Sequence, residues 1–225
     1  MAQIITQYGL ILLRAMGQTL LLALFGLFFG CILGVIFGLL SVVKNKVCNA
    51  IALVYVNVIR GVPMIVLAFF VYIGVPYAFK NYLHIPLVFT ALTAGTICLA
   101  MNCGAYMSEI IRAGIQSIDV GQMEAARSLG LPYWRGMFRV VLPQAIRNMI
   151  PSIVNQFIIT LKDTSILSVI GFPELVNKAK NVVAITFKSF EVYFIIGIMY
   201  LIIILILQQV AKILERRLNR GRRRA

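Results

Sequence analysis

The sequence predicts an all-α integral membrane protein with five transmembrane helices, and three observations support this fold class. Of its 225 residues, 61% are hydrophobic and only 12% are charged, whereas a soluble domain carries about a quarter charged residues. The apolar residues form runs longer than the roughly 20 residues that cross a bilayer as a helix. The Lys and Arg residues gather mainly in the intervals between these runs and at the C-terminal end.

The five predicted spans share one domain, residues 15–212, between an external N-terminal segment (1–14) and a basic cytoplasmic tail (213–225). The spans cover residues of about 18–43, 50–75, 87–111, 146–170 and 190–211. In the second span, Arg60 stands beside Gly61 and Pro63, which predicts a helix break whose freed carbonyls the arginine satisfies. The fourth span is the most polar, but its flanks are strongly apolar and the charge pattern requires an odd number of spans.

The basic residues predict the orientation. Lys and Arg number 21 against seven acids, and 14 of the 21 fall after the first, third and fifth spans, whereas five fall on the other side. The positive-inside rule therefore places the N-terminus outside, and the 112–145 interval and the C-terminus in the cytoplasm. This asymmetry argues against half of an inverted pair, and it favours anionic lipid over nucleic acid as the partner of the excess charge.

Several functions are not supported by the residues present. The four cysteines show no metal-like spacing, and His84 alone cannot form a zinc site. No phosphate-binding Gly-x-x-x-x-Gly-Lys-Ser/Thr stretch occurs, so ATP hydrolysis would need another chain. No nucleophile–base constellation stands out, and no removable signal peptide precedes the first span. We therefore interpret the chain as a non-enzyme without a cofactor of its own.

The cytoplasmic stretch 121–145 predicts a helix, a break and a second helix. Glu124 lies near the start of the first helix, where a negative charge suits the helix dipole. Ala126 and Gly130 are four residues apart, so they would form a small face that a partner can approach closely. Pro132 is expected to end this helix, and Pro143 suits a first helical position. An ordinary surface helix remains the alternative.

The same stretch resembles the EAA loop of ABC-importer permeases. Glu-Ala-Ala at 124–126 is followed at the fixed intervals by Gly130, a β-branched residue and Leu-Pro at 142–143. The segments VIRGVPMIVLAFF (58–70), AYMSEIIRAGIQSIDVGQMEAARSLG (105–130) and LKDTSILSVIGFPEL (161–175) resemble the polar amino-acid branch of this family. These motifs follow in order along nearly the whole chain.

The resemblance implies a type-1 ABC importer permease fold and a set of partners. A second permease chain completes the pathway, two cytoplasmic ATPases bind ATP and magnesium, and an extracytoplasmic binding protein delivers a polar amino acid. The EAA helix would be the coupling helix that docks in the ATPase. Its predicted contact residues are Glu124, Ala125, Ala126, Gly130 and Leu131.

Polar residues at membrane depth are expensive and usually line a path. These residues are Arg60, Asn102, Glu109, Asn155, Gln156, Lys162 and Asp163. Among these, the family resemblance favours Asn102 and Asp163, and we predict that they and the adjacent Lys162 bind substrate. Counted from Arg112 and Arg147, Asn102 and Asp163 would lie about 10 Å apart in depth. The alternatives for Asp163 are a pair with Lys162 or a helix-end cap, and Glu109 with Arg112 is expected to form an i,i+3 pair.

Two alternatives for the function remain open at this point. One is a permease of the same class for another small solute. The other is a channel or membrane-assembly protein in which the EAA-like loop is a coincidence. Neither the amino acid nor the identity of the second permease chain follows from the sequence.

Overall fold

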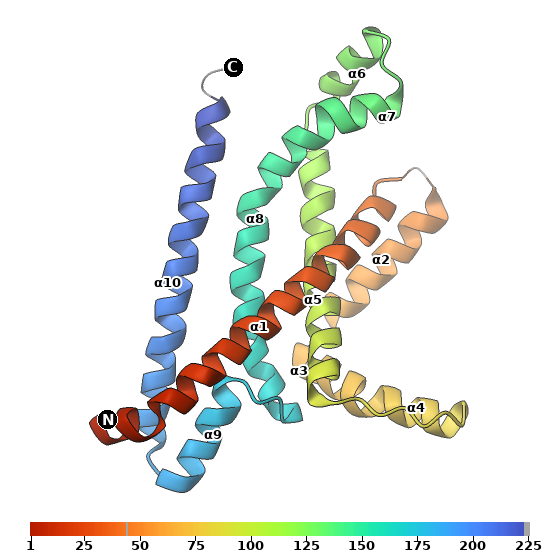
Figure 1. Ribbon diagram of the computed structural model, residues 1–225. Helices are drawn as coiled ribbons and strands as arrows, with labels where there is room; N and C mark the ends of the chain where they lie inside the picture. The colour runs from red at the N-terminus through yellow and green to blue at the C-terminus, as the bar shows by residue number, and fades with distance from the viewer. Residues whose placement is uncertain (44, 223–225) are drawn as a thin grey trace.

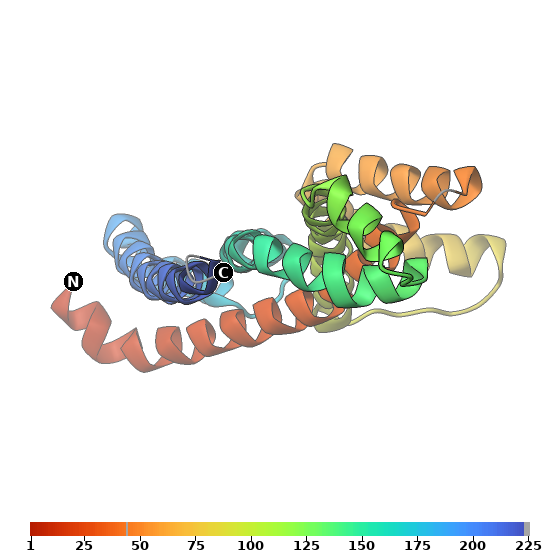
Figure 2. The same ribbon diagram turned by 90° about the horizontal axis from the view of Figure 1, so that it is seen from above.

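A computed structural model describes residues 1–43 and 45–222, with side chains up to Ile213, and every regular element in these ranges is helical. The helices α5 (Ala91–Gln116), α8 (Leu142–Asp163) and α10 (Ser189–Arg222) run upright in Figure 1, and α1 (Ala2–Leu40) crosses them diagonally. Seen from above in Figure 2, α1 lies along one side of this row. The predicted all-α fold class is confirmed.

The N-terminal segment differs from the prediction. Residues 1–14, expected to precede the first span, are the beginning of one continuous 39-residue helix, which ends at Leu40. Ile4 and Leu12 are buried against α9 (Leu175–Thr186) and α10. Polar residues such as Gln3 and Arg14 interrupt the apolar run in the sequence. In the fold both are exposed, and apolar residues of the same helix such as Leu10 and Leu13 are exposed beside them.

Four glycines at four-residue intervals allow α1 to lie directly against α5. These glycines and the α5 residues that face them, in order, are Gly26, Gly30, Gly34 and Gly38 against Leu99, Cys103, Met107 and Ile111. A Cβ atom added at Gly34 would lie only 2.5 Å from the Cβ of Met107. Because the α1 glycines lack side chains, the two helices approach more closely than larger residues would allow.

The second predicted span, residues 50–75, is not one continuous helix. α2 (Lys46–Gly61) ends before Val62 and Pro63, which are extended, and α3 (Met64–Phe69) begins directly afterwards. Proline lacks an N–H and disfavours a helical conformation in the residue before it, so the chain breaks here. The predicted break is therefore confirmed, whereas the span itself consists of two helices.

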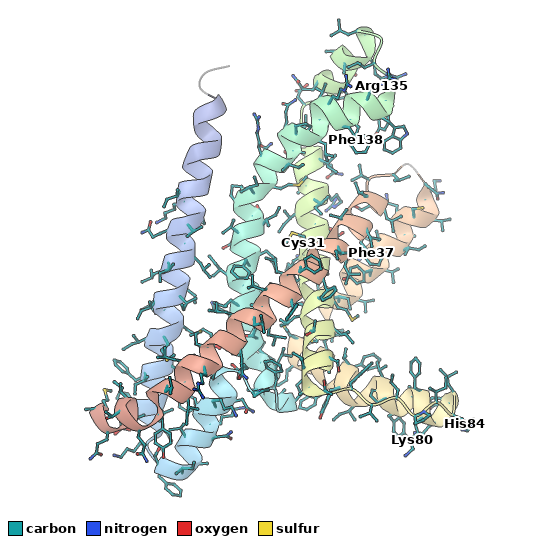
Figure 3. The ribbon with its side chains drawn as sticks, viewed as in Figure 1. Cys31, Phe37, Lys80, His84, Arg135 and Phe138 are labelled. Carbon is teal, nitrogen blue, oxygen red and sulfur yellow. The ribbon has the colours of Figure 1, made fainter. Side chains whose placement is uncertain are left out.

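A lateral arm follows this broken span. A π-helical segment, Phe70–Gly74, joins α3 to α4 (Val75–Tyr82), and α4 contains no buried residue. In Figure 1 this helix runs sideways from the upright row. Figure 3 shows Lys80 and His84 at the far end of the arm. The chain then returns to the bundle through residues 83–90, and Thr90 caps the N-terminus of α5.

The 112–145 interval forms a projecting unit at one end of the bundle. It contains the end of α5, then α6 (Val120–Ser128) and α7 (Tyr133–Gly136), which extend past the top of α5 in Figure 1. A π-helical segment, Met137–Val141, continues α7 into α8. Pro132, expected to end the first helix, instead precedes α7, because α6 already stops at Ser128.

By length and composition, four helical segments of the described chain could cross a membrane. They are Ala2–Leu40, Met64–Tyr82, Tyr133–Ile170 and Ser189–Ile213. α5 is not among them although it has 26 residues, because polar side chains such as Asn102 and Glu109 lower its hydropathy. The count of five spans therefore stays a prediction. The tail expected at 213–225 continues α10 as far as Arg222, and its side chains beyond Ile213 lie outside the described residues.

Candidate functional site

Two polar contacts define how the antiparallel helices α5 and α8 are aligned. Near the α6 end, Asn148 Nδ2 donates to Ser117 Oγ at 3.0 Å. Fifteen residues away on each helix, Asn102 Nδ2 donates to Asp163 Oδ2 at 3.2 Å. A rise of 1.5 Å per residue gives about 22 Å between the two contacts along both helices. The equal spacing brings Asn102 and Asp163 to the same height.

The structure therefore brings together two of the three predicted substrate-binding residues. The predicted depth difference of about 10 Å was wrong, because Arg112 and Arg147 are not level with one another. Asn148 pairs with Ser117, so Arg147 lies several residues beyond Arg112 along the bundle axis. We refer to Asn102 and Asp163, which are both half-buried, as the polar pair.

Met64 completes the surroundings of the polar pair and was missed by the sequence analysis. Its Sδ atom lies 3.6 Å from Asn102 Nδ2. Met64 is the first residue of α3, directly after the extended residues Val62 and Pro63. The predicted break was the available signal in the sequence, because a helix that begins within a span can place its first side chain against a neighbouring helix.

Lys162 is not part of this arrangement. Its side chain is exposed, and the ion pairs found among the described residues do not include one with Asp163. Asp163 also makes no capping hydrogen bond to the 3₁₀ segment that begins at Thr164. Neither alternative role of Asp163, a pair with Lys162 or a helix-end cap, matches its contacts.

The remaining polar residues of α8 have separate environments. Gln156 is buried, with its Nε2 atom 3.5 Å from Thr160 Oγ1, whereas Asn155 is exposed. In the described part of the chain no group of three His, Cys, Asp or Glu side chains could hold a metal ion. The polar pair, in contrast, joins α5 and α8 by a side-chain hydrogen bond.

A second group of polar residues lies closer to α6. Arg112 donates twice to Glu109, at 2.8 and 3.3 Å, which confirms the predicted i,i+3 pair. Arg60 lies 3.8 Å from the same carboxylate, and its guanidinium carbon lies 4.8 Å from the centre of the Tyr106 ring. Arg60 was expected to serve the break on its own chain segment, but its partners are on α5. We name Arg60, Glu109 and Arg112 the charged cluster.

A cavity lies beside Glu109 of the charged cluster. It has a volume of about 620 Å³ between α5 and α8, and Glu109 belongs to its lining together with Arg147 and Asn148. The cavity is widely open to its surroundings, so the carboxylate of Glu109 faces a space that a small molecule could enter.

The expected small face on α6 is not present. Ala126 is buried, and a Cβ added at Gly136 would lie 3.4 Å from its methyl group. Gly130 lies beyond the end of the helix with φ +79°, a conformation that glycine adopts without strain. Ala126 therefore packs within the chain and Gly130 forms the turn. Leu131, also predicted as a contact, is partly buried and donates its N–H to Ala126 O at 3.1 Å.

The exposed part of this unit is formed by other residues. Glu124 and Ala125 are exposed, and Leu129, which the sequence analysis did not select, is 84% exposed. Ala125 and Leu129 are four residues apart, so they share one face. Figure 3 shows Arg135 on the side of α7 that faces α6 and Phe138 on the opposite side.

Comparisons with known proteins agree with one another. The family described as binding-protein-dependent transport system inner membrane component matches residues 26–220. The chain is 36% identical to a glutamine transport system permease protein of Escherichia coli (strain K12) over 209 residues, 93% of each chain. It is also 36% identical to a putative glutamine transport system permease protein of Rickettsia typhi, over 89% of each chain.

Solved structures give the same result. A crystal structure of an amino acid ABC transporter with histidines matches with a TM-score of 0.87 and 36% identity, over 95% of this chain and 96% of that one. An inward-facing methionine ABC transporter, MetNI, matches with a TM-score of 0.76 over 92% of this chain and 95% of that one. At 19% identity, the second match supports the fold alone.

Proposed function

Because the chain belongs to the family of binding-protein-dependent transport system inner membrane components and is a permease subunit of an amino-acid ABC importer, we propose that its polar pair contacts the amino acid during transport. The hydrogen bond between Asn102 and Asp163 carries this proposal. Ionisable groups at membrane depth are costly, and they usually mark a substrate path. Asp163 has no cationic partner among the described residues within ion-pair distance.

The chemistry of the pair suits a polar amino acid. A carboxylate accepts hydrogen bonds from an ammonium, a guanidinium or a carboxamide, and the Asn102 amide both donates and accepts. Two relatives are named as glutamine permeases, and the carboxamide of glutamine can bond to both members of the pair. Another small polar solute with a donor group is the second candidate.

The remaining partners belong to the same proposal. An ABC transporter of this family joins the permease to an ATPase and to a permease partner. We infer that ATP and magnesium bind to the ATPase, and that an extracytoplasmic binding protein delivers the amino acid. The second permease can be a copy of this chain or a different one. The charge distribution supports an N-terminus outside and a cytoplasmic α6.

In this arrangement α6 docks on the ATPase. The exposed residues Glu124, Ala125 and Leu129 form the docking face that we propose. Ala126, Gly130 and Leu131 contribute indirectly, because they pack the helix and form its terminal turn. An exposed leucine at a helix end adds apolar area that a partner can cover.

Asp163→Asn tests the proposed substrate site. The two side chains are nearly the same size, so packing should survive. Losing the charged acceptor of a hydrogen bond from the substrate costs about 1.5–3 kcal/mol. We expect uptake of labelled amino acid into cells or proteoliposomes to fall at least roughly tenfold. Expression, assembly with the ATPase and basal ATP hydrolysis should stay near normal.

The control is Asn81→Ala, which removes an exposed polar side chain from α4, the helix that runs sideways from the upright row. This variant should transport normally. If Asp163→Asn instead abolishes expression, Asp163 is structural and the proposed site is wrong. If uptake is unchanged, the pair does not contact the substrate.

A further inference from the structure

The polar pair and the charged cluster lie on one face of α5. Asn102, Tyr106 and Glu109 follow at intervals of four and three residues, which places them above one another on a helix. Glu109 is seven residues from Asn102, and the helical rise makes this about 10 Å. A molecule that leaves the polar pair along this face toward α6 therefore meets the charged cluster next.

The charged cluster carries a net positive charge. One carboxylate, Glu109, stands against two guanidinium groups. Arg112 takes both of its oxygens at 2.8 and 3.3 Å, whereas Arg60 reaches it only at 3.8 Å. The pairing of Glu109 is therefore nearly complete with Arg112 alone, and the charge of Arg60 is only partly compensated.

Arg60 has unused hydrogen-bonding capacity. A guanidinium presents five N–H donors, and among the described residues no hydrogen bond to an Arg60 donor is found. The guanidinium carbon of Arg60 lies 4.8 Å from the centre of the Tyr106 ring, a cation–π distance that helps to hold the group in place. A planar guanidinium edge fits the two oxygens of a carboxylate.

We propose that Arg60 binds the α-carboxylate of the amino acid, while the polar pair binds the end of its side chain. This assignment rests on the proposed function and specifies the substrate class. The α-ammonium is adjacent to the α-carboxylate and so stays at the Arg60 end, while the far end of the side chain reaches the polar pair, about 10 Å from Glu109 along α5. The substrate is therefore an α-amino acid of medium length with a hydrogen-bond donor at its far end.

The spacing fits such a molecule. Hydrogen bonds of about 3 Å at each end occupy more than half of the 10 Å interval when they lie along it. Inclined bonds and the lateral reach of the Arg60 side chain leave room for a side chain of three or four carbon atoms. Glutamine and arginine both have this form, whereas alanine or glycine would reach only one of the two groups.

The test compares an acid with its amide in binding. L-Glutamine, L-arginine and their α-amides are titrated into the detergent-solubilised permease–ATPase complex without binding protein, which would impose its own selection. In the wild type we expect each acid to bind at least roughly tenfold more tightly than its amide, since hydrogen bonds to charged groups are strong. In Arg60→Gln the acid should weaken by a similar factor while the amide is unchanged, so the preference disappears.

Two further variants separate binding from folding. Arg60→Lys keeps the charge but loses the planar fork, and it should retain only part of the acid preference. Arg14→Gln removes an exposed arginine of α1 and should retain the full acid preference. If Arg60→Gln binds acid and amide more weakly in parallel, or keeps the wild-type preference, the inference is overturned. If the wild type binds neither amino acid, the proposed function fails instead.

Discussion

Glu174 is buried, with 0% exposure, although it lies between the segments that could cross a membrane. Its carboxyl group accepts the N–H groups of Val176 and Asn177 at 2.8 and 2.6 Å and so caps α9, and Tyr200 donates to it at 3.2 Å. Burial raises the pKa of Glu174 to about 7, against the opposing effect of these hydrogen bonds and of Lys180.

This pKa predicts that stability decreases as pH rises. The folded state holds a proton between about pH 4.5 and 7 that the unfolded state has released, so folding is favoured at the acidic end of this window. Glu174 should contribute about 1–3 kcal/mol less stability at pH 8 than at pH 5. Thermal unfolding of the solubilised protein should show this decrease. The decrease should be much smaller in Glu174→Gln, and an equal decrease in both proteins would show that other groups cause it.

At the scale of single residues, polarity at membrane depth was the useful signal. It gave seven candidates, among which the family resemblance favoured Asn102 and Asp163, and these two are in contact in the structure. It could not exclude Lys162, because the sequence does not show whether a lysine next to a half-buried aspartate points toward the site or away from it. Met64 and Glu174 were missed because their roles depend on which helix lies opposite.

At the scale of elements, α6 shows why a motif predicts a helix more reliably than its exposed face. The Glu-Ala-Ala motif lies on a helix as predicted. The helix ends two residues before Gly130, and Gly136 packs on Ala126. The predicted periodicity assumed a longer helix, so it placed the buried Ala126 and the turn residue Gly130 together on an outer helical face.

Leu129→Glu tests the docking face of α6. A charge at this exposed position should oppose the burial of the leucine against the ATPase, which we expect to weaken association at least roughly tenfold. Co-purification of the ATPase with a tagged permease measures the effect. Leu83→Glu makes the same change at an exposed position of the lateral arm and should leave co-purification intact. Normal ATPase recovery with Leu129→Glu would contradict the docking face.

At the scale of the whole molecule, the charge count predicts the orientation. Single cysteines at Gln3 and Asn219, in a background without the four native cysteines, report the two ends. An impermeant thiol reagent should modify the first in intact cells and the second only after permeabilisation, because the basic intervals remain in the cytoplasm. The reverse labelling pattern would place α6 outside and exclude its contact with the ATPase.

The fold class and the approximate positions of most spans followed from hydropathy, which depends on each segment separately. The arrangement of the helices did not follow from hydropathy, because it depends on contacts between pairs of helices. The heights of Asn102 and Asp163 were estimated from separate arginines, whereas the contact between Ser117 and Asn148 sets their actual alignment. The composition of α4 likewise does not predict that this helix runs sideways from the upright row.

The glycine contacts between α1 and α5 have a consequence for movement. Each α5 side chain occupies a place where α1 has none, so sliding one helix along the other would force Cβ atoms into the backbone. We therefore expect α1 and α5 to move together as one rigid unit. Two residues that contact α5 flank the break at Val62 and Pro63. Arg60, in the charged cluster, precedes the break, and Met64, beside the polar pair, follows it. In the proposed binding mode, bending at this break would release one end of the substrate while the other end is still bound.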